Sequence, residues 1–131
     1  MALYRLHVAA ALVFVVSIVV QVFLAGAAIA NLGGSGDFAT HREFGFTAVG
    51  IVALSVVVTA LLARLPRREV GWTALLFVLY IVQTSLPGLK SVSPAFGALH
   101  PVNALFLFGL SFWYARRVWR GMPSGTAGSA S

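Results

Sequence analysis

Four long stretches of this 131-residue chain are almost free of charged side chains, and this feature limits its fold more than any other. The first, from Val8 to Ala30, contains no Asp, Glu, Lys or Arg. As a helix it would be about 34 Å long, enough to cross a hydrocarbon core about 30 Å thick. We therefore predict an all-α bundle of four transmembrane helices over residues 1–121, followed by a disordered tail at 122–131. The predicted spans are residues 6–30, 41–63, 70–88 and 100–119.

The composition excludes several other classes of protein. The chain is 60% apolar and only 9% charged, whereas soluble domains are about 25% charged. It has no cysteine, which excludes disulfides, thiolate catalysis and iron–sulfur clusters. The net charge of +6 resembles that of nucleic-acid-binding proteins. However, the basic residues lie beside the ends of the apolar stretches, so we expect the lipid bilayer as partner and no nucleic acid.

The start of the chain also resembles a secretory signal peptide. Arg5 precedes a long apolar run that ends in Ala28-Ile-Ala30, an A-x-A pattern typical of a cleavage site. The run is longer than the apolar part of a usual signal peptide, and three more apolar stretches follow it. We therefore expect the first stretch to be retained as a transmembrane helix.

The basic residues predict the orientation in the membrane. In a four-span arrangement two of them, Arg42 and Lys90, lie on one side, and the other side carries Arg5, Arg64, Arg67, Arg68, Arg116, Arg117 and Arg120. Because cytoplasmic loops are enriched in Lys and Arg, both termini are predicted to be cytoplasmic, in a bacterial inner membrane. An aromatic belt is expected at the same face, formed by Trp72, Trp113, Tyr114 and Trp119.

A short motif occurs twice and indicates an internal repeat. Residues 21–26 and 83–88 both read Q-x-x-L-x-G, and each copy is followed by a loop, a histidine and an apolar stretch. The histidines are His41 and His100, 20 and 17 positions after the glutamine of their copy. This pattern predicts two helical hairpins related by a pseudo-twofold axis along the membrane normal. Pro101 is expected at the first position of the fourth helix.

The two histidines are candidate axial ligands of one haem iron. Each is predicted in the opening turn of a helix, and both helices run in the same direction, so the imidazoles lie at the same depth. In a four-helix bundle these two helices can lie diagonally, with a cofactor between them. The alternative is that each histidine caps its helix or faces water. His7 lies at the opposite end without a matching partner, and we expect it at the membrane interface.

Other residues are candidates for the same site. Gly45 and Ala104 each follow a histidine by four positions and so lie on its face one turn deeper, where a small side chain leaves room. Arg42 and Lys90 are the cations available for the haem propionates. Gln21 and Gln83 are polar groups in apolar helices, and two roles stay open for them. They either join helices by hydrogen bonds, or each orients the opposing histidine or a loop carbonyl near the site.

These motifs resemble one half of haem A synthase, a membrane protein made of two related four-helix bundles. The resemblance covers residues 8–119 and rests on His41-Arg42, His100 and the two Q-x-x-L-x-G turns. It implies that the second and fourth helices present the haem ligands near the outer face. The family's catalytic half has an acidic residue in an E-x-x-H-R motif, where this chain has Phe38, so we do not expect haem-methyl oxidation. The chain also resembles small four-span bacterial proteins with the same two-histidine layout.

From these features we expect a membrane protein that binds one b-type haem and transfers electrons. Two imidazole ligands leave the iron no open position, which favours electron transfer over oxygen chemistry. The expected partner is a quinone or a redox protein near the outer face. The alternative is a cofactor-free accessory or assembly subunit of a larger membrane complex, and a transporter is less favoured because few interior groups are polar. Catalytic activity and a homodimer stay open.

Overall fold

A computed structural model describes residues 1–33 and 36–122, and within them every regular element is helical. The elements are α1 (Ala2–Ile29), α2 (Ala39–Phe44), the π-helix η1 (Gly45–Val49), α3 (Gly50–Leu62), α4 (Arg67–Ser85), the 3₁₀-helix η2 (Gly88–Ser91) and α5 (Pro94–Arg120). Since α2, η1 and α3 follow one another without a break, the described residues form four long helices. The predicted all-α class is confirmed. The predicted disordered tail lies, from residue 123 on, outside the described residues.

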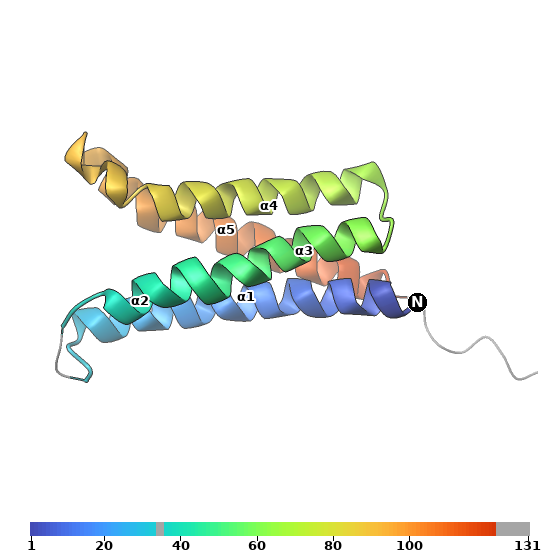
Figure 1. The fold of residues 1–131 in the computed structure, drawn as a ribbon, viewed down its shortest axis with the longest axis horizontal. Coiled ribbons are helices and arrows are strands. Elements are labelled where there is room, and N and C mark those ends of the chain that lie inside the picture. Colours follow the sequence, from blue (N-terminus) through green and yellow to red (C-terminus); the bar gives the residue numbers. More distant parts are fainter. Residues whose placement is uncertain (34–35, 123–131) are drawn as a thin grey trace, which may run out of the picture.

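The four long helices lie side by side along one axis (Figure 1). The N-terminus, the turn between α3 and α4 and the last residues of α5 meet at one end, which we call the basic end. The loop between α1 and α2 and the segment between α4 and α5 meet at the other, which we call the histidine end. The predicted grouping of the basic residues therefore holds in space, because Arg5, Arg64 and Arg120 come from three elements that share one end.

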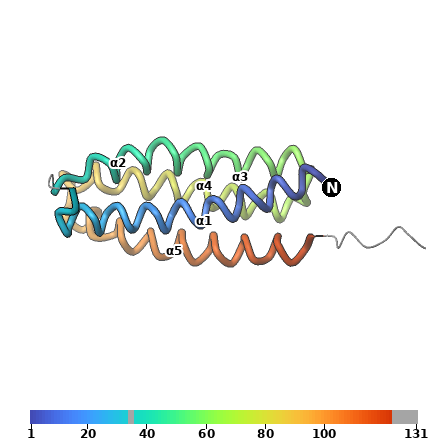
Figure 2. The backbone as a smooth tube through the Cα atoms, turned by 90° about the horizontal axis from the view of Figure 1, so that it is seen from below, coloured from blue at the N-terminus to red at the C-terminus, as the bar shows by residue number. Residues whose placement is uncertain are grey.

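Each helix contacts two neighbours, and this fixes which helices are diagonal. Both α1 and α4 pack against α3 and α5. Figure 1 shows α1 and α4 at opposite edges, and Figure 2, turned by 90°, shows α3 and α5 at opposite edges with α1 and α4 between them. The helix that carries His41 and the helix that carries His100 are therefore diagonal partners, as we predicted.

The bundle is apolar inside and outside. Its core is formed by buried side chains of all four helices, including Phe14, Val56, Leu76 and Leu107. The outer surface carries large apolar side chains that are at least half exposed, among them Val16, Phe23, Ile51, Leu105 and Phe106. A surface of this kind is unfavourable in water but suits a hydrocarbon solvent, in which helices gain nothing by hiding apolar groups.

Among the described residues, three helices are long and apolar enough to cross a membrane. They are Ala2–Ile29, the continuous helix Ala39–Leu62, and Pro94–Arg120. The remaining long helix, α4, has 19 residues and begins with Arg67, Arg68 and Glu69. Its apolar part therefore starts only at Val70, and it is the shortest of the four.

The helix starts differ from the prediction, most of all for the fourth helix. We expected it to begin at His100, but α5 begins at Pro94, where the Ser93 hydroxyl accepts a hydrogen bond of 3.4 Å from the Ala95 amide. Pro94 thus takes the early position predicted for Pro101, which lies inside the helix instead. Proline suits the first turn because it lacks an N–H, and the chain offers two candidates. The sequence analysis predicted the wrong proline.

Candidate functional site

His41 and Gln21 form a closed pair at the histidine end. The imidazole Nδ1 lies 3.1 Å from the backbone oxygen of Gln21, and its Nε2 lies 3.2 Å from the Gln21 side-chain Nε2. The same amide nitrogen donates to the backbone oxygen of His41 at 2.7 Å. These contacts join α1 to α2 and leave the imidazole half-buried. The motif residue and the histidine that follows it are therefore direct partners.

His100 and Gln83 make the same two contacts in the second hairpin. Here Nδ1 lies 2.9 Å from the backbone oxygen of Gln83, and Nε2 lies 3.2 Å from the Gln83 side-chain nitrogen. The contacts join α4 to α5, and this imidazole is also half-buried. Each glutamine thus links two helices, as one of the two predictions had it. The other prediction is corrected, because each glutamine orients the histidine of its own hairpin and not the opposing one.

These contacts also determine which nitrogen of each imidazole carries the hydrogen. A backbone carbonyl oxygen can only accept, so Nδ1 must donate to it. An amide NH₂ can only donate, so Nε2 must accept. In both His41 and His100 the hydrogen therefore lies on Nδ1, and the Nε2 lone pair is directed at the glutamine amide. This is the tautomer in which a histidine commonly binds a metal through Nε2 while a carbonyl holds Nδ1–H.

The two imidazoles meet across the diagonal of the bundle. The ring centroids of His41 and His100 lie 6.3 Å apart, and the ring planes are inclined by 75°. Two residues 59 positions apart are therefore close together at one end of the bundle, while each Nε2 contacts the glutamine of its own hairpin. Within the part of the chain that the structure describes, no group of three or more His, Asp or Glu side chains could hold a metal ion.

Gly45 lies directly against the first pair. It is buried, and a Cβ atom built on it would lie 2.6 Å from the Gln21 side-chain nitrogen. A larger residue would therefore push the amide away from His41. We expected Gly45 to make room for a cofactor or a facing helix, and the group that it admits is the Gln21 amide.

The helix below His41 contains a π-turn that the sequence reading missed. In η1 the wider turn leaves two carbonyl groups accessible, and the Tyr80 hydroxyl from α4 donates to the oxygens of Gly45 (3.1 Å) and Phe46 (3.3 Å). A Cβ on Gly50 would lie 2.5 Å from that hydroxyl, so the glycine admits the tyrosine. Segments of π-helix occur often at functional sites.

Asn103 is a second residue that the sequence reading missed. Its side-chain nitrogen donates to the side-chain oxygen of Gln83 at 2.8 Å and to the backbone oxygen of Leu79 at 3.0 Å. The Gln83 amide is thereby fixed with its nitrogen toward His100. A signal was present, because Asn103 is an amide in an apolar span and follows His100 by one helical turn.

Among the described residues, the other predicted site residues make no hydrogen bond to the histidine pair. Arg42 and Lys90 are exposed at the histidine end, and Lys90 packs beside Gly97 at the start of α5. Ala104, one turn deeper than His100, is half-buried. The structure therefore places Arg42 and Lys90 at the correct end of the bundle and leaves their proposed role as a prediction.

His7 contradicts our expectation of an interfacial residue. It is fully buried at the basic end, with Nδ1 3.0 Å from the Thr59 hydroxyl and Nε2 2.9 Å from the Tyr114 hydroxyl. Thr59 uses its own hydrogen on the backbone oxygen of Ser55 at 2.7 Å. His7 Nδ1 therefore donates to Thr59, and Tyr114 donates to Nε2. Tyr114, expected in an aromatic belt, is fully buried as well.

The buried position of His7 follows from its helix face. It shares one face of α1 with Ala11, Phe14 and Ile18, which follow at intervals of three to four and are all buried. Because each partner hydroxyl comes from a different helix, the three side chains link α1, α3 and α5. This network stabilises the basic end and lies apart from the histidine pair.

Comparison with known proteins links the chain to a family whose role is open. Residues 21–88 match the model of a family described as "Family of unknown function (DUF6220)". The match begins at Gln21 and ends at Gly88, so it contains both Q-x-x-L-x-G motifs and His41, whereas His100 lies beyond it. No curated protein and no solved structure matches.

Proposed function

The chain belongs to the DUF6220 family of unknown function, and we propose that it is a membrane protein that binds one b-type haem between His41 and His100. The observation that carries the proposal is the close pair of imidazoles from two diagonal helices. Two imidazole nitrogens that share an iron lie about 4 Å apart, which puts their ring centres about 6 Å apart. The centroid separation of 6.3 Å agrees with this spacing.

The number of protein donors also favours a haem over a bare metal ion. Structural and catalytic metal sites made by protein alone use three or four side chains. The pair of His41 and His100 has no such company among the described residues. Two donors on opposite sides suit an iron that brings its other four ligands in a porphyrin ring. The donor set therefore fits a haem.

The neighbouring residues have definite tasks in this proposal. Gln21 and Gln83 hold the Nε2 lone pairs, so their amides would have to turn aside when a metal takes these positions. The bonds from Nδ1 to the backbone carbonyls would remain and keep both rings oriented. Arg42 and Lys90, exposed at the same end, would meet the anionic propionates. Such a haem, with both axial positions filled, would supply reversible one-electron transfer.

The resemblance to one half of haem A synthase supports this reading of the histidines. This chain has Phe38 where the catalytic half of that family has an acidic residue, and this difference argues for electron transfer rather than haem oxidation. A single haem near one membrane face cannot carry an electron across about 30 Å of hydrocarbon. We therefore propose exchange with a quinone or a redox protein at that face.

The topology belongs to the same proposal. All four long helices would cross the membrane as two repeated hairpins, with the basic end in the cytoplasm and the histidine end outside. Single cysteines are clean reporters because the chain has no cysteine of its own. A cysteine at Ser93 should react with an impermeant reagent from outside, and one at Arg67 only from the cytoplasm. Reaction of both from the same side would contradict the four-span arrangement.

The experiment that tests haem binding uses the full chain, purified from membranes of cells supplied with haem. We expect a low-spin b-type absorption spectrum and one haem per chain. The double variant H41A/H100A, prepared in parallel, should carry none. Wild-type protein without haem, even after incubation with added haem, would contradict the proposal.

A second function is favoured by one observation. All four imidazole nitrogens of His41 and His100 already have hydrogen-bond partners. A cofactor-free accessory subunit would use these bonds only to hold its hairpins together. In that case H41A/H100A would lower the stability of the protein and change no spectrum.

A further inference from the structure

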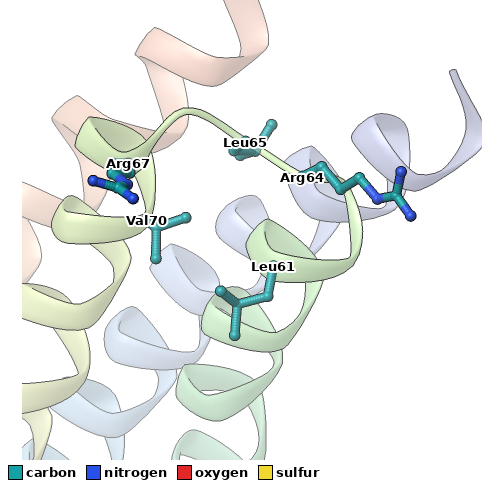
Figure 3. Close-up of a pocket in the computed structure, with 5 residues that line it drawn as sticks. All are labelled: Leu61, Arg64, Leu65, Arg67 and Val70. Carbon is teal, nitrogen blue, oxygen red and sulfur yellow. The ribbon is translucent and has the colours of Figure 1, made fainter.

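A shallow, largely open cavity of about 370 Å³ lies at the basic end, beside the turn that joins α3 to α4 (Figure 3). Leu61 of α3 and Val70 of α4 line it, together with Leu65 on the turn. Arg64 and Arg67 also line it, and Figure 3 shows their side chains extending on either side of the apolar residues. The cavity thus combines an apolar wall with two cations.

The charges of Arg64 and Arg67 are not neutralised by the part of the protein that the structure describes. The ion pair found there joins Arg117 to Glu69 at 2.7 Å, and it occupies the acidic residue nearest to the turn in sequence. Both cavity arginines are exposed, and their long flexible side chains can fold over the opening. An anionic group at the cavity would therefore find two guanidinium groups without competition from a carboxylate.

The backbone at Arg64 is unusual for an arginine. Its φ angle is +51°, in the left-handed region. The amides of Arg64 and Leu65 bond back to the oxygens of Leu61 (3.0 Å) and Ala60 (3.0 Å), which closes the end of α3. Glycine is the usual residue at this position. Arg64→Gly therefore removes the cation while it suits the turn, which makes it a useful test variant.

We propose that this cavity binds an anionic phospholipid, with the phosphate between Arg64 and Arg67 and the first acyl carbons against Leu61, Leu65 and Val70. Basic pockets between helix ends at a membrane face favour such headgroups, and arginine pairs well with phosphate. The apolar wall favours a lipid over a free phosphate ion. This inference requires that the chain lies in a membrane and is independent of haem binding.

The charge test compares two double variants of the full chain in neutral nanodiscs. R64G/R67Q removes both cavity cations, whereas R116Q/R120Q removes two exposed cations from the same end outside the cavity. Native mass spectrometry measures binding of dioleoyl phosphatidylglycerol, with phosphatidylcholine as the neutral lipid. R64G/R67Q should weaken binding by about tenfold or more and R116Q/R120Q by less than about twofold. Equal weakening in both would overturn the proposal.

The apolar wall is tested with neighbouring leucines. Leu61 and Leu62 are 56% and 55% exposed, but only Leu61 lines the cavity. Leu61→Ser should weaken phosphatidylglycerol binding several-fold, and Leu62→Ser should leave it unchanged. Inorganic phosphate at millimolar concentration should not displace the lipid. Displacement by phosphate, or equal effects of the two serine variants, would overturn the assignment to a phospholipid.

Discussion

Gln21 and Gln83 make the same two contacts with their histidines, but different neighbours hold them. The Gln83 oxygen accepts from Asn103, which also bonds to the backbone of α4. The Gln21 oxygen is buried, and none of the described residues donates to it. Instead, the Gln21 nitrogen makes an extra bond to the His41 backbone and lies against Gly45. The Gln83 amide is thus held by the Asn103 side chain, and the Gln21 amide by the His41 backbone and the space at Gly45.

This difference teaches that one motif can be stabilised in two ways. In the second hairpin a single polar residue, Asn103, fixes the amide. In the first, the fit depends on Gly45 and on the π-turn that Tyr80 bridges. Substitutions in the first hairpin should therefore act through packing, and substitutions in the second hairpin through hydrogen bonds. The predictions below test this contrast, in order of decreasing expected effect.

The largest effect should follow loss of either histidine. His41→Ala or His100→Ala removes one axial imidazole, so the iron should become five-coordinate and high-spin, or haem should be lost entirely. Absorption and electron paramagnetic resonance spectra measure this. His7→Ala, which cuts only the network at the basic end, should keep the low-spin spectrum. Low-spin spectra in both single variants would show that the two halves do not form one site.

The next effect concerns Gly45, where the first half depends on space. Gly45→Leu should displace the Gln21 amide, prevent haem incorporation and lower the free energy of unfolding by about 1–3 kcal/mol. Gly109→Leu is the control, because an added Cβ there meets nothing within 4 Å. Haem content and thermal midpoint should fall only in Gly45→Leu. Equal losses would mean that Gly45 reports general packing.

Asn103→Ala tests the second half. It removes two hydrogen bonds, so the free energy of unfolding should fall by about 1–2 kcal/mol. The thermal midpoint of the haem-free protein measures this change. Ser85→Ala, which removes an exposed bond within α4 (Ser85 hydroxyl to Ile81 oxygen, 2.8 Å), should change it little. An Asn103→Ala protein as stable as wild type would show that the Gln83 amide needs no such support.

The smallest effect is expected for Tyr80→Phe. This change removes the hydroxyl that bonds to the π-turn and should cost about 1 kcal/mol or less. Tyr4→Phe removes a similar bond at the basic end, from the Tyr4 hydroxyl to the Val118 oxygen. Both should lower the thermal midpoint slightly, but only Tyr80→Phe should shift the NMR signals of His41. If both variants shifted the His41 signals, or if neither did, the π-turn would not be specifically coupled to His41.

Much of the architecture could be predicted from the pattern of apolar residues. The distance between charged or turn-forming segments gives the length of each helix, and these lengths correctly indicated an all-α chain. They also indicated that each hairpin begins and ends at the same end of the bundle. The start of α5 was predicted six residues too late, because Pro94 and Pro101 both suit a first turn. In the structure the Ser93 hydroxyl, just before Pro94, caps the helix start by accepting from the Ala95 amide.

The sequence predicted the two histidines of the candidate site but not the residues that hold them and their glutamines in place. The repeated spacing of Gln and His placed His41 and His100 at one end, but we expected each glutamine to act on the opposing histidine, whereas it contacts the one in its own hairpin. The contributions of Asn103 and Tyr80 were missed, because neither belongs to the repeat. His7 was assigned to the interface since it lies near the chain start, although its helical face, shared with Phe14, points into the core.

The sequence by itself determined the helical class, the apolar surface and the position of both histidines at one end, because these depend on residue type and local spacing. Only the tertiary structure decided that α3 and α5 are diagonal and that two rings from them lie 6.3 Å apart. It also decided which polar side chains find partners, such as Asn103 with Gln83 and Tyr114 with His7. The reason is physical: a hydrogen bond or ring contact between distant residues depends on helix rotation and register, which are set by packing of the whole bundle.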